Sequence, residues 1–451
     1  MKRNTLILAA GKSTRMKSKK SKVLHEILGK SSLAYVVDLA HDIDSDEIFV
    51  IVSPQEENIQ LLFGEELNYV TQLQQLGTGD AVASAAPFLE DGTTLVLYGD
   101  VPCLRQESLL DLFDFHEEQG NDLSILSVEM KDPTGYGRIV RDALGVMAIV
   151  EHRDASEEQC EIREINSGIL LMNTELLKMY ITELTPSNVQ GELYLTDLVE
   201  IFRRAGHKVD AMRIDEEEQI VGINTRRQLA EATRIMQQRV NTYWMENGVT
   251  LINPDTIFIE ESVEIEPDVV IWPGTFLKGE THISTDCEIG PEVTLDSTFV
   301  GVGTRILRST VMQAEIGDNT QVGPYTYIRP NSVIGDNCRI GDFVEIKNSS
   351  VGSGTKVSHL TYVGDADLGE DINVGCGVVF VNYDGKLKQR SVIEDGVFLG
   401  CNTNIVAPLK VETGAYVAAG TTLTEDVPKD SLAIGRSRVT IKTNWRNKQG
   451  E

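Results

Sequence analysis

The second half of the chain returns an aliphatic residue every six positions over long stretches, and this rhythm constrains the fold more than any other feature. One series starts at Ile259, a second at Ile316 and a third at Ile393. Such a hexapeptide repeat predicts a parallel β-helix, in which each hexad supplies a short strand and one inward-pointing side chain. We therefore expect residues 247–451 to form one solenoid domain that ends in a C-terminal tail.

The rhythm slips at residues 346–351 and 363–368, and it is lost at 380–392, where VNYDGKLKQRS should leave the coil as a loop. Interruptions of a solenoid often carry binding residues. The hexads near this loop hold several polar side chains, namely Arg329, Lys347, His359, Tyr362, Asn373, Asn382 and Tyr383. Any one of them fits a solvated rim residue. As a set they indicate a site.

The first half has a different pattern, in which short apolar runs alternate with amphipathic segments. TLILAA (residues 5–10) and TTLVLYGD (93–100) are typical of buried strands, whereas residues 79–89 fit a helix. Over residues 1–225 this alternation predicts a Rossmann-like α/β domain, with a mostly parallel sheet and helices on both faces. Ligand sites in such sheets lie beyond the carboxyl ends of the strands. Apolar residues at three- and four-residue steps then predict a helical linker over residues 226–246.

Charge and cysteine usage exclude several classes of protein. The formal net charge of −28 disfavours nucleic acid and anionic membranes as partners. A phosphate site must then be built locally, from a few basic side chains or from backbone N–H groups. No apolar run is long enough to cross a bilayer, and the first residues lack the pattern of a signal peptide. The six cysteines are scattered, which fits reduced thiols, so we expect a cytoplasmic protein.

Two motifs in the first half combine glycine with polar groups. LAAGKSTRM (residues 8–16) is a turn whose backbone N–H groups, together with Lys12, Arg15 and Lys22, suit phosphate oxygens. Taken alone, it fits an ordinary strand-to-helix turn equally well. QLQQLGTG (72–79) offers amides and a hydroxyl, which suit the uncharged donors and acceptors of a pyrimidine base.

A third motif brings a carboxylate. YGDVP (residues 98–102) ends a buried strand with Asp100, which could bind Mg²⁺ because this ion prefers oxygen ligands. Asn224, in GIN, could supply a second oxygen. The alternative for each is a purely local role, as a turn aspartate or as a helix N-cap.

Together these motifs resemble those of the sugar-nucleotide pyrophosphorylases, and the resemblance covers nearly the whole first half. It implies that Mg²⁺ on Asp100 and Asn224 holds UTP, while Arg15 and Lys22 stabilise charge as a sugar 1-phosphate attacks. The positions matching the family's nucleotide-sugar-binding residues are Leu8, Ala9, Ala10, Gly11, Lys22, Gln72, Gly77, Thr78, Tyr98, Gly99, Asp100, Gly137, Glu151, Asn166 and Asn224. Ser13 departs from the glycine usual there, so we expect a slightly reshaped turn.

The polar set of the second half suits acetyl transfer to an amine. An ammonium cannot attack a thioester, so a base must remove its proton, and His359 is the candidate because imidazole titrates near neutral pH. Arg329 and Lys347 would hold a sugar phosphate. The remaining members would hold sugar hydroxyls or orient the base: Tyr362, Asn373 and Asn382.

SHLTYVGD (residues 358–365) and NYDGK (382–386) are similar to motifs of the hexapeptide-repeat acetyltransferases. The order pyrophosphorylase, helical arm, β-helix resembles a bacterial family of bifunctional uridylyltransferase–acetyltransferases over essentially the full chain. This resemblance implies a left-handed β-helix, a homotrimer, and acetyl-CoA bound between neighbouring coils. The matching acetyl-CoA positions are Cys376, Asn382, Tyr383, Cys401, Ala419 and Arg436.

The resemblance implies two reactions. Acetyl-CoA and glucosamine-1-phosphate would give N-acetylglucosamine-1-phosphate at the C-terminal site. UTP and that product would give UDP-N-acetylglucosamine and pyrophosphate at the N-terminal site, feeding peptidoglycan and other cell-envelope polymers.

Some features leave alternatives open. Cys376 and Cys401 stand where alanine and serine are usual, so their effect on the thioester is undecided. Basic residues of the tail either meet coenzyme A phosphates or are solvated; they are Arg438, Lys442, Arg446 and Lys448. A pyrophosphorylase whose β-helix only assembles or regulates it, and a non-catalytic trimeric scaffold, are the competing functions.

Overall fold

The computed structural model describes residues 2–55, 57–65, 67–143 and 145–445. Arg446 and Lys448 of the basic tail lie outside the described residues. The chain divides into two compact units, Met1–Met236 and Gln237–Glu451, which are treated separately below. No helix in the described part of the chain is both long and apolar enough to span a membrane.

Unit 1 is built on a mixed sheet with the strand order β11-β7-β10-β6-β1-β4-β5. Its strands are β1 (Lys2–Leu8), β4 (Glu47–Val52), β5 (Asn68–Thr71), β6 (Gly92–Tyr98), β7 (Leu123–Glu129), β10 (Glu164–Asn173) and β11 (Val209–Ile214). The pairs β1–β4, β1–β6, β4–β5 and β7–β11 are parallel, whereas β10 runs antiparallel to both β6 and β7. These seven strands are therefore mostly parallel, as expected, with β10 as the exception among them.

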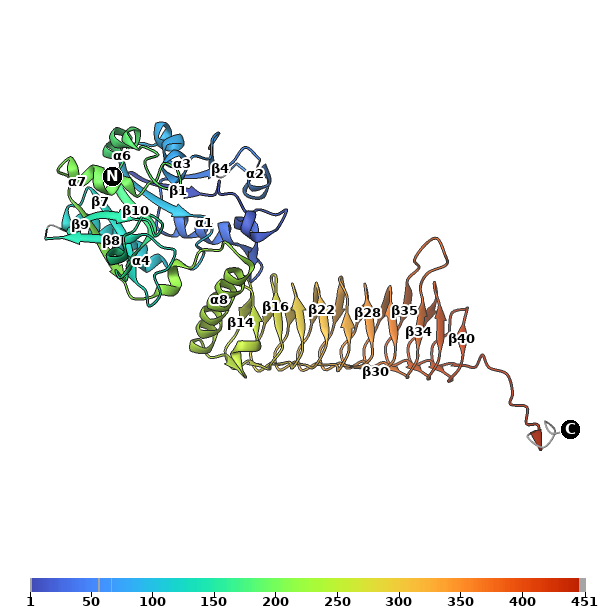
Figure 1. The fold of residues 1–451 in the computed structure, drawn as a ribbon. Coiled ribbons are helices and arrows are strands. Elements are labelled where there is room, and N and C mark those ends of the chain that lie inside the picture. The colour runs from blue at the N-terminus through green and yellow to red at the C-terminus, as the bar shows by residue number, and fades with distance from the viewer. Residues whose placement is uncertain (1, 56, 66, 144, 446–451) are drawn as a thin grey trace. The chain divides into compact units, whose positions relative to one another are not determined.

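Helices cover both faces of this sheet, as Figure 1 shows. They include α1 (Ser32–Asp42), α3 (Thr78–Ala85), α4 (Gln106–Gln119), α6 (Thr174–Tyr180) and α7 (Asp197–Arg204). Side chains alternate along β1, so that Leu6 and Leu8 pack in the core beneath α3 and α7, while Ile7 packs with residues of α1 and α4. A hairpin of β8 (Arg138–Asp142) and β9 (Gly145–Val150) extends the sheet from β10. The predicted Rossmann-like α/β fold is confirmed.

Helix α8 (Arg226–Glu246) contributes to both units. In unit 1, Ile235 and Met236 join a buried cluster that contains Met16. In unit 2, Gln237 and Asn241 donate hydrogen bonds to the carbonyl of Ile257, at 2.9 and 3.0 Å. These side-chain amides tie the end of the helix to the first coil of the solenoid.

Unit 2 is a left-handed parallel β-helix of three sheets, with 11, 10 and 9 strands in the described residues. Every strand pairs in parallel with the strand of the next coil, so the aliphatic residues stack into one continuous core. Three residues fill the gap between the first two sequence series at steps of five or six, and they are Val300, Ile306 and Val311. The predicted β-helix is confirmed, and its register is more continuous than the six-residue rhythm alone indicated.

One coil carries the expected loop. Leu368 pairs with Ile393, whereas on the preceding coil Val351 pairs with Leu368 after a much shorter stretch of chain. The extra residues lie between β34 (Val379–Val381) and β35 (Ser391–Ile393) and project from the coil in Figure 1.

Candidate active sites

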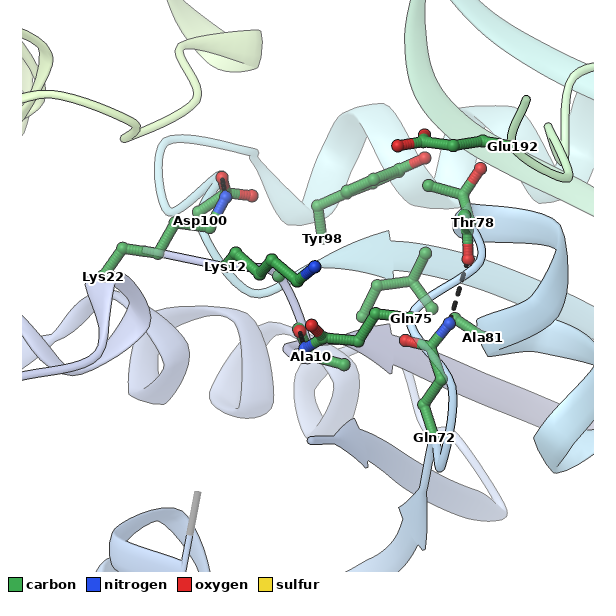
Figure 2. Close-up of a pocket in the computed structure, with 13 residues that line it drawn as sticks. Ala10, Lys12, Lys22, Gln72, Gln75, Thr78, Ala81, Tyr98, Asp100 and Glu192 are labelled. Carbon is green, nitrogen blue, oxygen red and sulfur yellow. Dashed lines mark hydrogen bonds and ion pairs between the residues drawn. The ribbon is translucent and has the colours of Figure 1, made fainter. Parts of the chain in front are cut away.

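A cavity of about 310 Å³ lies where the parallel strands β1 and β6 end, at Leu8 and Tyr98. Nine residues expected to bind the nucleotide sugar line it: Leu8, Ala10, Gly11, Lys22, Gln72, Gly77, Thr78, Tyr98 and Asp100. In Figure 2, Gln72 and Thr78 stand on one side of the cavity and Lys22 and Asp100 on the other. The lining also includes Lys12, Gln75, Ala81 and Glu192. Glu192 was not expected, because it lies far along the chain and in no recognisable motif.

The glycine turn before α3 is shaped by close packing against a distant loop. Gly77 has φ +127°, and a Cβ there would lie 2.5 Å from the carbonyl oxygen of Leu193. Backbone hydrogen bonds join the segments, from Leu193 N to Leu76 O at 2.7 Å and from Gly79 N to Leu193 O at 2.8 Å. Only glycine satisfies both the backbone angle and the contact.

Hydrogen bonds donated by the side-chain amide nitrogens orient the two glutamines, Gln72 and Gln75. Gln72 Nε2 donates to Gly77 O at 3.1 Å and to Asp80 Oδ2 at 2.7 Å, and Gln75 Nε2 donates to Ala10 O at 2.5 Å. The carbonyl oxygens of both side chains have no hydrogen-bond partner among the described residues. They remain available to accept from an N–H group of a base.

Four charged or polar side chains meet at the strand ends. The ammonium of Lys22 forms an ion pair with the buried carboxylate of Asp100 and donates to Asn224 Oδ1 at 3.0 Å. Arg15 Nη2 donates to the same oxygen at 3.0 Å. Two oxygen acceptors from distant parts of the chain thus converge on one cation, which is the ammonium of Lys22.

Ser13 does not strain the turn. Its φ is −76°, an ordinary value for any residue, so the reshaping expected from replacing glycine is not needed. Instead the hydroxyl of Ser13 accepts a hydrogen bond from the backbone N–H of Lys22 at 2.8 Å. The serine therefore supports the lysine that the site uses.

A second cavity of about 510 Å³ shares Lys22, Tyr98 and Asp100 with the first and adds Arg15 and Asn224. The two spaces therefore adjoin at the same charged group.

Three of the expected nucleotide-sugar-binding residues, Gly137, Glu151 and Asn166, form a group of their own. Asn166 N donates to Gly137 O at 2.9 Å, and a Cβ on Gly137 would lie 3.2 Å from Glu151 Oε1. Glu151 lines a different cavity, of about 480 Å³. Burial raises the pKa of Glu151, and burial together with the charges of Glu151 and Asp100 raises the pKa of Tyr98. Tyr98, the last residue of β6, is therefore influenced by a carboxylate of this group and by the one at the strand ends.

Ala9 and Gly99 lie beside the first cavity without lining it. Their backbone N–H groups are used within the sheet, by the carbonyls of Ile51 at 2.9 Å and Leu8 at 3.0 Å. They position the neighbouring Ala10 and Asp100.

In unit 2, a connected polar network surrounds Lys347. Its ammonium lies 3.4 Å from Oδ2 of the buried Asp365, which also accepts from Asn348 at 2.6 Å and Asn382 at 2.5 Å. Asn382 in turn donates to the hydroxyl of Tyr362 at 3.3 Å. Burial acts to raise the pKa of Asp365, but the amide hydrogen bonds and Lys347 outweigh it and lower the pKa. Asp365 was not expected from the sequence, yet it joins two residues that were, Lys347 and Asn382.

Arg329 lies one coil before Lys347 on the same sheet. This sheet contains β25 (Tyr327–Ile328), β28 (Glu345–Lys347) and β31 (Tyr362–Gly364), with Ile328 paired to Ile346. Arg329 Nη1 donates to Glu345 Oε1 at 2.9 Å. From the loop, Lys388 approaches Lys347, whose like charge lowers the pKa of Lys388. Three basic side chains therefore gather near the loop.

His359 belongs to a neighbouring sheet, which contains β27 (Arg339–Asp342), β30 (Lys356–His359) and β33 (Asn373–Val374). Its Nδ1 lies 2.6 Å from Asp342 Oδ1. The register of this sheet brings Cys376 to the position of His359 on the next coil and Cys401 to that position on the coil after. Asn373 lies on the same sheet.

His359, Cys376 and Cys401 thus form a column along one corner of successive coils, and backbone hydrogen bonds extend it. Asn402 N donates to Cys376 O, and Gly420 N donates to Cys401 O, each at 2.8 Å, so that Ala419 follows Cys401. Arg436 Nη1 donates to Ala419 O at 2.6 Å. Four expected acetyl-CoA residues are therefore brought together beside His359, and they are Cys376, Cys401, Ala419 and Arg436.

The column and the Lys347 network are separate within one chain. Across the described part of unit 2, no hydrogen bond or ion pair joins His359 to Lys347, and the side-chain hydrogen bonds of Asn382 go to Asp365 and Tyr362. Tyr383 is exposed in the loop, where it pairs with Lys388.

Comparisons with known proteins agree with both halves. The MobA-like NTP transferase domain matches residues 5–159, and the bacterial transferase hexapeptide family (six repeats) matches residues 313–348. The bifunctional protein GlmU of Caldanaerobacter subterraneus subsp. tengcongensis is 49% identical over 98% of this chain and 97% of its own length. The GlmU proteins of Thermoanaerobacter pseudethanolicus and Brevibacillus brevis are 48% and 47% identical, over 98% and 99% of this chain and 97% of each relative.

This identity extends over nearly the full length of both chains, and the two sites described above occur in the corresponding halves. The chain therefore belongs to the GlmU family of bifunctional proteins, and it is an N-acetyltransferase and uridylyltransferase that makes UDP-N-acetylglucosamine in two steps.

Proposed function

We propose that uridylyl transfer takes place at the charged group shared by the two cavities of unit 1. The observation that carries this assignment is the convergence of Asp100 and Asn224 oxygens on one cation, between the two spaces. UTP would occupy the cavity lined by Gln72 and Thr78, and N-acetylglucosamine-1-phosphate the other. The free carbonyl oxygens of Gln72 and Gln75 suit the N–H edge of uracil.

The donor set suits Mg²⁺. One carboxylate and one amide oxygen are too few to hold the ion alone, which fits an ion that keeps waters and shares substrate phosphates. When bound, Mg²⁺ would neutralise phosphate charge and raise the electrophilicity of the α-phosphorus. In the structure the ammonium of Lys22 contacts both oxygens, which supports a site that favours positive charge.

Lys22 and Arg15 supply the positive charge of the protein itself. Both donate a hydrogen bond to Asn224 Oδ1 in the structure, and we propose that they turn to phosphate oxygens when the nucleotide binds. The sugar phosphate would then attack in line, with pyrophosphate leaving. Positioning and charge neutralisation account for such a transfer without a covalent intermediate on the protein.

We propose that acetyl transfer takes place at the coil corner of His359. The amine nitrogen of glucosamine-1-phosphate attacks the thioester carbon while the imidazole takes the proton of the amine, and the sulfur of coenzyme A leaves. Arg329 and Lys347 hold the sugar phosphate, while Tyr362 and Asn373 contact its hydroxyls. Acetyl-CoA would lie along the column of Cys376, Cys401 and Ala419, with Arg436 near its phosphates. Asn382 and Tyr383 of the loop would also contact it.

We further propose a homotrimer. Large apolar side chains are exposed along the coils of unit 2, among them Phe276, Phe299, Tyr325, Val333 and Phe343. Exposed apolar side chains on a solenoid favour self-association. Such an assembly could also unite the His359 column of one chain with the Lys347 network of another. We propose a cytoplasmic location, since the cysteines of the described chain are unpaired and a reducing compartment keeps them so.

The experiment that tests these assignments supplies UTP, acetyl-CoA, Mg²⁺ and glucosamine-1-phosphate together and identifies products by mass. UDP-N-acetylglucosamine, coenzyme A and pyrophosphate are expected. Chelation of Mg²⁺ should stop the reaction sequence after the first step, so that N-acetylglucosamine-1-phosphate accumulates. Accumulation of an unacetylated UDP-sugar instead would contradict the proposed acetyl site. Light scattering of the same sample gives the number of chains per particle.

A further inference from the structure

His359 is held on one side only. Its Nδ1 lies 2.6 Å from Asp342 Oδ1, and the two residues are register partners on adjacent coils. A carboxylate accepts but does not donate, so Nδ1 carries the proton and the neutral ring has its lone pair on Nε2. Among the described residues, Nε2 has no hydrogen-bond partner. The ring is therefore fixed in the tautomer that a general base needs.

His282, another histidine of the coil, shows a different kind of pairing. Its Nδ1 lies 3.2 Å from Glu264 Oε2 and its Nε2 lies 3.4 Å from Glu266 Oε1, while the ring stacks on Phe299. Carboxylates approach both nitrogens, so neither is free to take a proton from a substrate. The one-sided contact of His359 is thus not a general property of histidines in this solenoid.

The pair also stands where the proton must be taken. The column that begins with Asp342 and His359 continues through Cys376 and Cys401, the positions assigned to acetyl-CoA. Other charged groups on the same two strands are Arg339 and Lys356, which are register partners of each other. Asp342 is the carboxylate in contact with the ring.

We propose that Asp342 is a positioning residue for acetyl transfer, which holds the Nδ1–H tautomer of His359 and stabilises the imidazolium that forms. This inference rests on the proposed function of the site. The amine nitrogen forms a bond to the thioester carbon, and the carbon–sulfur bond breaks. The amine proton passes to Nε2 of His359 and from there to the departing thiolate of coenzyme A.

The test uses Asp342→Asn and Asp342→Ala in the full-length protein, assayed with acetyl-CoA and glucosamine-1-phosphate across about pH 6 to 9. We expect kcat to fall about 10- to 100-fold, with KM for both substrates within about 2-fold of wild type. The pH–rate profile should change as well, because the amide removes the negative charge beside the ring. Asp342→Glu should restore part of the rate.

Two controls separate positioning from a structural effect. Glu264→Gln alters the matched carboxylate–histidine contact at His282 and should leave the acetylation rate and its pH profile unchanged. Uridylyl transfer, measured on the same Asp342 variants, should also be unchanged. On a His359→Ala background, Asp342→Ala should cause no further loss, because the residue acts only through the ring.

The outcomes separate the inference from the function on which it rests. An unaltered rate and pH profile in Asp342→Asn, with His359→Ala inactive, would overturn the positioning role alone. The positioning role would also be overturned if Asp342→Ala lowered the acetylation rate by the same factor in the His359→Ala protein as in the wild type. An active His359→Ala would overturn the base assignment as well, and a wild-type protein that transfers no acetyl group would overturn the proposed function itself.

Discussion

The ammonium of Lys22 donates a hydrogen bond to the side-chain oxygen of Asn224 across 3.0 Å, although the two residues lie 202 positions apart. The contact joins the short 3-10 helix Lys22–Leu24, which follows the first glycine turn, to the segment that leads into α8. Asp100, at the end of β6, binds the same ammonium. Three separate segments of unit 1 therefore meet at one charge, so we expect the site to be sensitive to single substitutions.

Asp100→Ala should abolish uridylyl transfer and spare acetyl transfer. The substitution removes one of the two proposed oxygen ligands and leaves Lys22 without its carboxylate, so we expect a loss of at least about 100-fold in kcat. Acetylation of glucosamine-1-phosphate by the same sample should stay near the wild-type rate. Separate assays of the two steps check this, and calorimetry should show weaker binding of UTP with Mg²⁺. Loss of both activities in a folded sample would show that the two sites are not independent.

His359→Ala should have the opposite effect. Without the imidazole no group is placed to take the amine proton, and general base catalysis contributes about 100- to 10,000-fold. Coupled release of coenzyme A measures the acetyl step, while uridylyl transfer is followed with added N-acetylglucosamine-1-phosphate. Recovery of acetylation at high pH would agree with this role, because the deprotonated amine of the substrate is then abundant without a catalytic base. An undiminished rate at neutral pH would remove His359 from the mechanism.

The structure also shows how far sequence patterns reach. The six-residue rhythm predicted the β-helix but lost its register between Leu295 and Ile316, because Val300 and Val311 follow their predecessors by only five residues. Coils of a solenoid accept such shorter steps at a corner, since only the inward side chain must stay in register. Periodicity alone treats each step as a break.

Residues that contact a site but lie far from its motifs in the sequence were not predicted. Asp342 is 17 positions from His359, which is one coil, so a continuous register would have paired them. The slip at residues 346–351 falls between the two and hides this relation. Glu192 lines the cavity proposed for UTP from a loop with no periodic signal, and nothing in a single sequence indicates that Leu193 packs on Gly77.

Gly77→Ala should impair the nucleotide cavity by a steric route. The added Cβ would meet the carbonyl of Leu193 at 2.5 Å in a backbone conformation of φ +127°, so the turn before α3 must shift. We expect unit 1 to lose about 1–3 kcal/mol of stability and KM for UTP to rise several-fold. Hydrogen exchange of unit 1 and steady-state kinetics check the two effects.

Gly191→Ala is the matched control for this substitution. Gly191 also has a positive φ, of +67°, but a Cβ there would meet nothing within 4 Å. It therefore carries the conformational cost without the collision, and its effect on KM for UTP should be small. Equal effects of the two substitutions would show that backbone strain, rather than contact with Leu193, governs the cavity.

Asp197→Asn should stabilise unit 1 near neutral pH. Asp197 begins α7, and burial, followed by the charges of Glu200 and Asp154, raises its pKa from 3.8 to about 6. The folded protein therefore binds this proton more tightly than the unfolded chain, and stability falls as pH rises between these two values. Removing the charge abolishes that loss, so the variant should gain nothing below about pH 4 and most above about pH 6.

The measurement of this gain needs a probe of unit 1 alone, because all three tryptophans lie in unit 2. Hydrogen exchange of peptides from β1 and β7 at several pH values provides it. Glu175→Gln, at an exposed position in the first turn of α6, is the matched control, since it removes an acid from a helix N-terminus without relieving burial. It should stabilise at no pH. A gain from Asp197→Asn that is the same at low and neutral pH would mean that better packing, and not relief of the buried charge, is its cause.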